Sequence, residues 1–198
     1  MKILVIGGHG TIGKRVVEHF IATHEVLTGG RSTGDVRVDI SQRDAIRKAL
    51  DAVGPLDAIV CTAGEAKWNC FEELSEEDFY VGLNSKLMGQ VNVVQLGQDY
   101  LSPEGSITLS TGILADHPVV RTTGAAMVNG ALHSFVKAVD LEMGLVRVNA
   151  VSLGLVEDAY EQYHRYFPGY NVISTAQVVN AYVRSVEGKM RGKIIRMY

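Results

Sequence analysis

The sequence predicts an α/β protein in which helices cover both faces of a doubly wound parallel sheet, within one domain spanning residues 1–198. Two observations carry this prediction. A short apolar run, Ile3 to Ile6, is followed at once by three regularly spaced glycines, Gly7, Gly10 and Gly13. Patterns typical of strands and helices then alternate to the end of the sequence, with no internal repeat and no low-complexity linker between them.

The glycine turn has the features of a dinucleotide-binding site. The apolar run before it suits a strand buried on both faces, and the amphipathic stretch after it predicts a helix. Glycines allow a tight turn and a close approach to a pyrophosphate, while a helix N-terminus offers free N–H groups and partial positive charge. A glycine triplet alone is weak evidence, but its place between strand and helix favours a cofactor site over a turn without a ligand. The predicted contacts of this loop are Gly7, His9, Gly10, Thr11, Ile12 and Gly13.

Composition excludes several other classes of function. Of the 198 residues, 46% are hydrophobic, and the net charge of −3 gives no sign of nucleic-acid binding or of a basic membrane surface. No stretch is long and apolar enough to span a membrane, and we expect no signal peptide. The two cysteines, Cys61 and Cys70, are expected to be structural thiols in a reducing cytoplasm. We expect no metal site, because no His, Asp or Glu cluster has a metal-binding spacing.

Hydrophobic periodicity predicts the remaining elements in order. Further strands are expected at residues 24–28, 36–39, 56–61, 106–110, 147–152 and 192–197. Helices are expected at residues 41–53, 78–100, 123–143 and 176–186, with Ser41 as the cap of the first. Residues 65–77, which include Trp68 and Phe71, are expected to line the mouth of a pocket, and the tyrosine-rich segment 157–170 is expected to form a small lid.

Over nearly its whole length the chain resembles the short-chain dehydrogenase/reductase family. The motifs that carry the resemblance are Gly7-x-x-Gly10-x-x-Gly13, Val38-Asp39-Ile40, Cys61-Thr-Ala-Gly64, Leu83-Asn84, Ser106-Ile-Thr-Leu-Ser110-Thr111 and Arg147-Val-Asn-Ala-Val-Ser-Leu-Gly154. The resemblance implies a Rossmann-type nucleotide-binding fold and a cytoplasmic oxidoreductase of small carbonyl or alcohol substrates. It also implies a homodimer or homotetramer, built on the helix rich in small residues at 123–143. The cofactor contacts that it implies beyond the glycine turn are Asp39, Ile40, Cys61, Ala63, Gly64, Gly154 and Val156.

The end of the second strand favours NADP(H) over NAD(H). Many NAD-dependent enzymes place a carboxylate there to bind the ribose hydroxyls. This sequence instead has Gly29, Gly30, Arg31 and Ser32. An arginine with a neighbouring serine suits the extra 2′-phosphate of NADP(H).

The family's catalytic pair is missing from this sequence. In the family, a tyrosine serves as acid/base, and a lysine four residues later lies on the same helix face. No Tyr-x-x-x-Lys occurs here, and alignment of the helix places Ala125 at the tyrosine and Asn129 at the lysine. Thr111, or alternatively Ser110, matches the catalytic serine, and Asn84 matches the family's asparagine.

Several residues are candidates to replace the missing pair. Asn129 offers an amide for the ribose of the cofactor, and Tyr160 or Tyr163 of the lid offers a phenol as proton donor. Lys86 offers a positive charge, although residues two apart on a helix point to different faces. Two residues of the loop after the fifth strand, His117 and Arg121, are further candidates.

Three classes of function remain open on the sequence alone. The glycine turn and the lid favour an NADP(H)-dependent oxidoreductase. The missing pair favours a catalytically silent NADP(H)-binding redox sensor or regulator. A structural subunit without nucleotide binding is disfavoured, because Gly7, Gly10, Gly13 and Arg31 are all retained.

Overall fold

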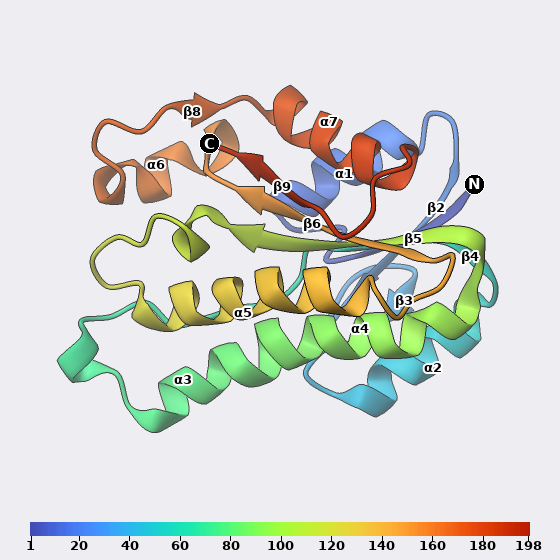
Figure 1. Ribbon diagram of the computed structural model, residues 1–198, viewed down its shortest axis with the longest axis horizontal. Coiled ribbons are helices and arrows are strands. Elements are labelled where there is room, and N and C mark those ends of the chain that lie inside the picture. The colour runs from blue at the N-terminus through green and yellow to red at the C-terminus, as the bar shows by residue number, and fades with distance from the viewer.

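One parallel sheet organises the computed structural model, which describes residues 1–198 (Figure 1). Its seven strands run in the order β3-β2-β1-β4-β5-β6-β9, and every neighbouring pair is parallel. The strands are β1 (Lys2–Ile6), β2 (Glu25–Gly30), β3 (Val36–Arg37), β4 (Leu56–Cys61), β5 (Leu101–Gly112), β6 (Arg147–Leu153) and β9 (Ile194–Met197). The predicted doubly wound Rossmann-type fold is therefore confirmed.

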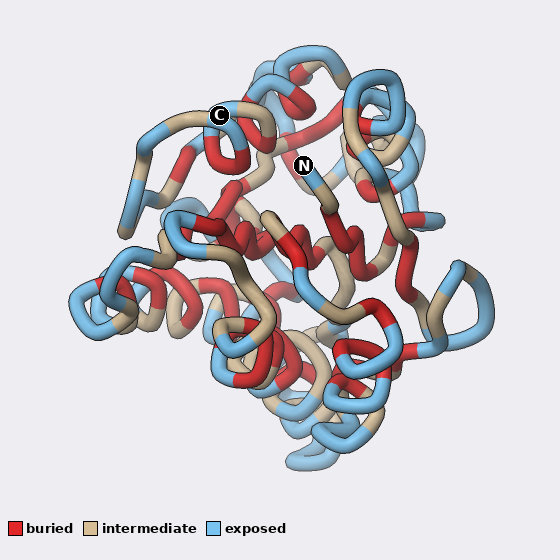
Figure 2. The backbone as a smooth tube through the Cα atoms, turned by 90° about the vertical axis from the view of Figure 1, so that its right-hand side faces the viewer, coloured by how far each residue is buried: buried red, intermediate tan, exposed pale blue.

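Helices cover both faces of the sheet, as Figure 1 shows. The helices α1 (Thr11–Phe20) and α7 (Thr175–Val186) pack on one face, and α2 (Arg43–Val53), α4 (Gly89–Gly97) and α5 (Thr123–Val139) pack on the other. The strands supply both layers because successive side chains point to opposite faces: Ile3 and Val5 join the first layer, whereas Leu4 and Ile6 join the second. Figure 2 shows the resulting buried strands at the centre of the molecule.

The winding of the sheet reverses between β1 and β4. From β1 the chain builds outward through β2 and β3, and from β4 it builds outward on the other side through β5 and β6. In sheets of this kind, ligands bind beyond the carboxyl ends of the strands at the point of reversal. The turn at Gly7 follows β1, and the loop at Gly64 follows β4, so both lie at this point.

The predicted helix 78–100 is a continuous helical segment with a wide turn inside it. It begins as α3 (Glu76–Gly82), where Ser75 and Asp78 form a reciprocal capping box. Residues Leu83–Met88 then form a π-helical turn before α4 continues to Gly97. Such turns shift the side chains that follow around the helix axis, and they occur often at functional sites.

Some predicted boundaries are wrong, for local reasons. Ser41 does not cap α2, because its hydroxyl donates a hydrogen bond to the Asp39 carboxylate. The helix begins at Arg43, and Gln42 is its N-cap residue. Strand β5 begins at Leu101, well before the predicted residue 106. Helix α5 ends at Val139 instead of residue 143, and the turn that follows contains Gly144 at φ 57°.

The tyrosine-rich segment 157–170 folds as a run of short helical turns around α6 (Tyr160–Tyr163). Two short strands, β7 (Leu155–Val156) and β8 (Val172–Ile173), pair with each other and close the segment at its base. Phe167 is buried in a small apolar cluster that also contains Ile113 and Leu114, which follow β5. The segment therefore lies against the carboxyl end of β5.

Candidate functional site

The turn after β1 has the geometry expected of an anion-binding loop. Gly7 has φ 85°, a conformation that favours glycine, and Gly10 is the N-cap of α1 with no side-chain hydrogen bond to the helix. No acidic residue lies in the first turn of α1. A Cβ on Gly13 would lie 2.0 Å from the carbonyl oxygen of Gly7, so only glycine lets the helix pack this closely on the loop. The N–H groups at the start of α1 are thus free to bind an anion.

A cavity of about 270 Å³, here called the glycine-turn cavity, lies beside this loop. It is lined by Ile6, Gly7, Gly10, Gly30, Arg31, Val38, Asp39, Ile40, Thr62, Ala63, Gly64, Glu65 and Ser85. Thr62 joins the loop after β4 to the glycine turn after β1, because its hydroxyl lies within hydrogen-bond distance of the carbonyl oxygens of Ile6 and Gly7. Asp39 is engaged in its own turn, where its carboxylate accepts hydrogen bonds from the backbone and hydroxyl of Ser41.

Arg31 is the only cation on the wall of the glycine-turn cavity. Its guanidinium lies 3.3 Å from the carboxylate of Glu65, and both side chains are more than half exposed. The carboxylate nearest in sequence, Asp35, turns back onto β2, where it accepts hydrogen bonds from the backbone and hydroxyl of Thr28. These bonds hold the pKa of Asp35 below its ordinary value. Asp35 therefore does not line the cavity, whose two acidic lining residues are Asp39 and Glu65.

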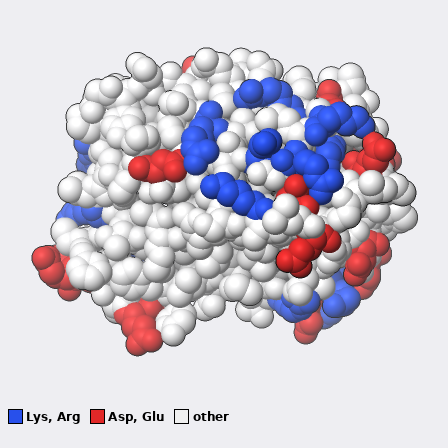
Figure 3. Space-filling view, in the orientation of Figure 1, with Lys and Arg blue, Asp and Glu red and all other residues white.

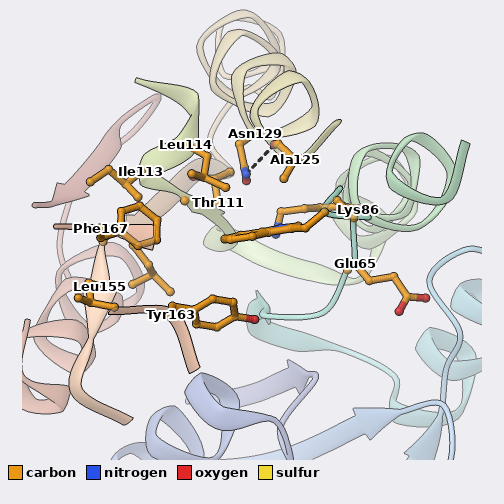
Figure 4. Close-up of a pocket in the computed structure, with 16 residues that line it drawn as sticks. Glu65, Lys86, Thr111, Ile113, Leu114, Ala125, Asn129, Leu155, Tyr163 and Phe167 are labelled. Atoms are coloured by element: carbon orange, nitrogen blue, oxygen red, sulfur yellow. Dashed lines mark hydrogen bonds between the residues drawn. The ribbon is translucent and has the colours of Figure 1, made fainter. Parts of the chain in front are cut away.

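A larger cavity of about 430 Å³, the inner cavity, lies next to the glycine-turn cavity. Figure 4 shows the residues that line the inner cavity. The two share Gly64 and Glu65. Figure 4 shows Asn129 and Ala125 entering from α5 on one side, Tyr163 and Leu155 from the opposite side, and Lys86 from a third. Its remaining lining residues are Ala66, Trp68, Thr111, Gly112, Ile113, Leu114, Leu153, Gly154 and Phe167.

The polar wall of the inner cavity is built on β5 and α5. Thr111 at the end of β5 shares a hydrogen bond of 2.9 Å with Nε2 of the buried His133. Burial lowers the pKa of His133, although the charge of Asp116 opposes this shift. Asn129 donates its amide N–H to the carbonyl oxygen of Ala125, and its side-chain oxygen is buried without a partner. Because buried polar atoms are nearly always hydrogen-bonded, this oxygen marks a place for a donor on a ligand.

Comparison with known proteins identifies the family. A family model described as enoyl-(acyl carrier protein) reductase matches residues 9–191. The chain belongs to the short-chain dehydrogenase/reductase family. Members of this family of oxidoreductases bind nicotinamide cofactors and act on small molecules, so the predicted family and the coarse class of function are confirmed.

Several individual members of the family are similar to this chain. The protein lin1944 from Listeria innocua is 41% identical, with a TM-score of 0.97 over 100% of both chains. A small-chain dehydrogenase solved in complex with NADPH is 25% identical, with a TM-score of 0.89, over 100% of this chain and 96% of that one. L-xylulose reductase of Mesocricetus auratus is 33% identical over 127 residues, which are 59% of this chain and half the length of that relative. The human L-xylulose reductase is 28% identical over 170 residues, which are 76% of this chain and 70% of that relative.

The sequence alignment predicts Ala125 and Asn129 at the places of the family's tyrosine and lysine. Ala125 and Asn129 line the inner cavity from α5, four residues apart and on the same face of the helix. Ala125 carries no titratable group. The titratable side chains on the wall of the inner cavity, those of Glu65, Lys86 and Tyr163, come from other elements of the fold.

The structure separates the sequence candidates for chemistry into two groups. Thr111, Asn129, Tyr163 and Lys86 line the inner cavity. The others do not: Ser110 is buried in a 2.7 Å hydrogen bond with Tyr182, Tyr160 stacks on His164, and Asn84 is exposed. The π-helical turn explains the position of Asn84, because it brings Lys86 to the cavity wall instead.

The predicted cofactor residues are likewise divided. Seven of them line the glycine-turn cavity: Gly7, Gly10, Arg31, Asp39, Ile40, Ala63 and Gly64. Gly154 lines the inner cavity, while Val156 is buried behind it. His9, Thr11 and Ser32 are exposed, Ile12 is half-buried at the start of α1, and Gly13 packs on Gly7. Cys61 lies beneath the loop after β4, where burial raises its thiol pKa to about 11.

Two residues in and behind the site, Trp68 and Gln90, carry little signal in the sequence. Trp68 lines the inner cavity and packs its ring against Tyr163, at a centroid distance of 5.3 Å, whereas Phe71, paired with it in the sequence prediction, is 67% exposed. The fully buried Gln90 ties α4 to β5 by exchanging hydrogen bonds with the backbone of Ser110. A lone buried glutamine is visible in the sequence only as a polar residue within an apolar helix face.

Proposed function

We propose that this protein is an NADP(H)-dependent oxidoreductase that interconverts a small carbonyl compound and the corresponding alcohol. The observation that carries the proposal is that the two cavities adjoin, with Gly64 and Glu65 in the lining of both. A dinucleotide bound along the glycine turn extends from Arg31 at one end to Thr111 and Asn129 at the other. The bound nicotinamide supplies a hydride to the substrate, or takes one from it.

The residues present fit such a cofactor. The N-terminus of α1 presents free N–H groups and no carboxylate, as a pyrophosphate requires. The buried, unpartnered side-chain oxygen of Asn129 accepts a hydrogen bond from a ribose hydroxyl, at the place where the family has a lysine. Asp39 and Ile40 lie on the wall of the glycine-turn cavity, where the adenine is expected.

The preference for NADP(H) rests on Arg31. It lines the cavity at the end of β2, while Asp35 of the same segment is bound to Thr28. A guanidinium binds a 2′-phosphate through charge-assisted hydrogen bonds. The NADPH seen in a similar small-chain dehydrogenase agrees with this preference.

The inner cavity suits a small substrate. Its volume of about 430 Å³ has to hold both the nicotinamide and the substrate. Apolar side chains, among them Leu114, Leu155 and Phe167, make up most of its wall. The Thr111 hydroxyl, held by His133, is the group that orients the substrate oxygen. Because Tyr163 and Phe167 belong to segment 157–170, this segment decides which substrates enter.

We further propose that the protein is a homo-oligomer of the cytoplasm. The face formed by α4 and α5 carries few charges in Figure 3, and it exposes Met88 and Met127. An uncharged helical face of this kind suits contact with a second copy of the chain. Both cysteines are unpaired, as expected in a reducing compartment. Light scattering of the purified protein measures the oligomeric state directly.

The test of cofactor binding uses Trp68, the single tryptophan, as a reporter inside the cavity. Purified protein is titrated with NADPH and with NADH while its fluorescence is followed. We expect NADPH to bind more tightly and Arg31→Asp to weaken NADPH binding about 10–100-fold, the worth of a charged hydrogen bond. The matched control is Arg47→Asp, at an exposed arginine on α2, for which we expect no change.

A panel of small ketones and aldehydes then tests turnover, followed by the loss of NADPH absorbance. Turnover supports the oxidoreductase. The specific observation in favour of the silent redox sensor is that Ala125, a residue without a titratable group, lines the cavity from α5, where the family's acid/base tyrosine is expected. Tight NADPH binding with no turnover across the panel would support the sensor, and equal weak binding of both nucleotides would exclude both functions.

A further inference from the structure

Only three of the residues that line the inner cavity carry a titratable side chain: Glu65, Lys86 and Tyr163. Glu65 is 55% exposed and pairs with Arg31 at the outer end of the site. Tyr163 comes from the four-residue helix α6, and its ring packs against Trp68. Lys86 comes from the long helix that packs against the sheet and α5. Lys86 is therefore the titratable group that the long helix contributes to the cavity wall.

Lys86 lies where the two cavities meet. Its backbone packs on Gly64, the residue that both cavities share: a Cβ on Gly64 would lie 2.9 Å from the Cα of Lys86. Gly64 itself has φ 122°, a conformation that favours glycine. A dinucleotide that reaches from one cavity into the other passes beside Lys86.

The ammonium group of Lys86 has no partner within the protein. It makes no hydrogen bond and no ion pair in the structure, although the residue is half-buried. A buried or half-buried charge without a partner is costly, and proteins keep such groups mainly at functional sites. The unpartnered oxygen of Asn129 on α5 faces the same cavity, so the wall offers both a free cation and a free acceptor.

The surroundings of Lys86 make its proton easier to release than that of an ordinary lysine. Burial lowers its pKa, and the neighbouring Cys61 on β4 opposes this shift. The other titratable groups on the cavity wall are Glu65, after β4, and Tyr163 of α6. A lysine whose pKa moves toward neutrality can act as a general acid.

We propose that Lys86 is the proton donor for carbonyl reduction, in place of the missing tyrosine. The proposal rests on the proposed function. In the step, a hydride from the reduced nicotinamide forms a C–H bond with the carbonyl carbon, and the C=O π bond breaks. The Lys86 ammonium transfers one proton to the oxygen, which forms the O–H bond of the alcohol. NADPH becomes NADP⁺, and the neutral Lys86 amine takes a proton back from water.

This role sets the sign of the pH dependence. The donor has to be protonated before the step, so the rate of reduction falls as pH rises through the pKa of Lys86. In the reverse reaction the neutral amine takes the proton, so the rate of oxidation rises over the same range. A residue that supplied only positive charge would not make the rate of reduction fall and the rate of oxidation rise over the same pH range.

Four variants test the proposal in the full-length protein. Lys86→Met removes both charge and proton, whereas Lys86→Arg keeps the charge on a group that is not deprotonated in proteins. Tyr163→Phe removes the competing phenol. Lys48→Met, at an exposed lysine on α2, is the matched control. NADPH binding, followed through Trp68, shows that each variant is folded and loaded.

We expect both Lys86 variants to lose about 100-fold or more in kcat while NADPH still binds, the size of effect typical of a general acid. The limb of the pH profile should disappear in Lys86→Arg, whereas Tyr163→Phe should keep the limb, whatever it does to KM as a residue of the cavity wall. Full kcat in Lys86→Arg would overturn the proposal in favour of a purely electrostatic role. Loss of kcat only in Tyr163→Phe would transfer the role to Tyr163.

A second readout needs no turnover. Competitive labelling of lysines with acetic anhydride in the cofactor-free protein, read by peptide mass spectrometry, compares Lys86 with Lys48 across pH. We expect Lys86 to react at lower pH than Lys48, and identical pH dependences would overturn the proposal. If the wild-type protein binds NADPH but reduces no carbonyl, the proposed function fails, and the donor role falls with it. If the wild type turns over and Lys86→Met does so equally, only the role of Lys86 fails.

Discussion

Thr111 and His133 join the wall of the inner cavity to the interior of the protein through a buried hydrogen bond of 2.9 Å. Thr111 is the last residue but one of β5, and His133 lies one turn of α5 beyond Asn129. The imidazole and the Val151 carbonyl oxygen, at 3.4 Å, together fix the direction of the hydroxyl. Burial also lowers the pKa of His133, so the ring stays neutral under ordinary conditions.

Removal of either partner is expected to destabilise the protein. Thr111→Val leaves the buried His133 Nε2 without its partner, whereas His133→Leu leaves the Thr111 hydroxyl with only its long bond to the Val151 carbonyl oxygen. Each substitution should lower the free energy of unfolding by about 1–3 kcal/mol. In a double-mutant cycle measured by urea unfolding, the two should couple by about 0.5–1.5 kcal/mol. Tyr182→Phe breaks a comparable buried bond, to Ser110, outside the cavity, and should lower stability without changing KM. If the effects of Thr111→Val and His133→Leu were additive, the hydrogen bond between the two residues would contribute nothing to the free energy of unfolding.

Glu65 is expected to compete with the cofactor for Arg31. Their ion pair of 3.3 Å is exposed, and exposed pairs are worth roughly 0.2–1 kcal/mol. Glu65→Gln should therefore tighten NADPH binding by a factor of about 1.5–5 and leave NADH binding unchanged. Fluorescence titration at low and high salt measures both constants, and the gain should shrink at high salt. Weaker NADPH binding in this variant would mean that the carboxylate itself contacts the cofactor.

Gly13→Ala is expected to damage both the fold and the cofactor loop. The added Cβ would lie 2.0 Å from the Gly7 carbonyl oxygen, so the loop or α1 has to shift. Overpacking of this kind costs about 1–3 kcal/mol, more than alanine contributes through its higher helix propensity. Gly130→Ala on α5 is the matched control, because its Cβ meets nothing within 4 Å. Urea unfolding should show the control unchanged or stabilised, and equal effects of the two substitutions would contradict the packing at Gly13.

Asp116 is expected to make part of the stability dependent on pH. Hydrogen bonds from Arg196 and Tyr198 lower its pKa to about 2, against an ordinary value near 3.9. A carboxyl with a depressed pKa stabilises the fold above its unfolded-state pKa, and this stabilisation is lost as pH falls from about 4 towards 2. Asp116→Asn should therefore lower Tm at pH 7 by at most about 4 °C, with a smaller difference at pH 3. Thermal melting at both pH values measures this, and a gap that widened at pH 3 would contradict it.

The order of strands and helices follows from local patterns that are legible in the chain. Buried parallel strands such as 56–61 appear as apolar runs, and amphipathic helices such as 176–186 appear through the helical spacing of their apolar residues. Gly7, Gly10 and Gly13 mark the turn between strand and helix. These features are short-range, so no knowledge of distant contacts is needed to recognise them. The boundaries that were missed, such as the start of α2, depend on single side-chain hydrogen bonds.

The inner cavity depends on contacts that no local pattern reports. The sequence favours Asn84, which matches the family's asparagine, over Lys86. The structure instead places Lys86, in the π-helical turn Leu83–Met88, on the cavity wall and leaves Asn84 exposed. His133 appears as one more packing residue of α5 until β5 places Thr111 beside it. The absence of Tyr-x-x-x-Lys is evident from the sequence, but the group left facing the substrate is set by helix rotation and long-range packing. Periodicity alone does not encode either of these.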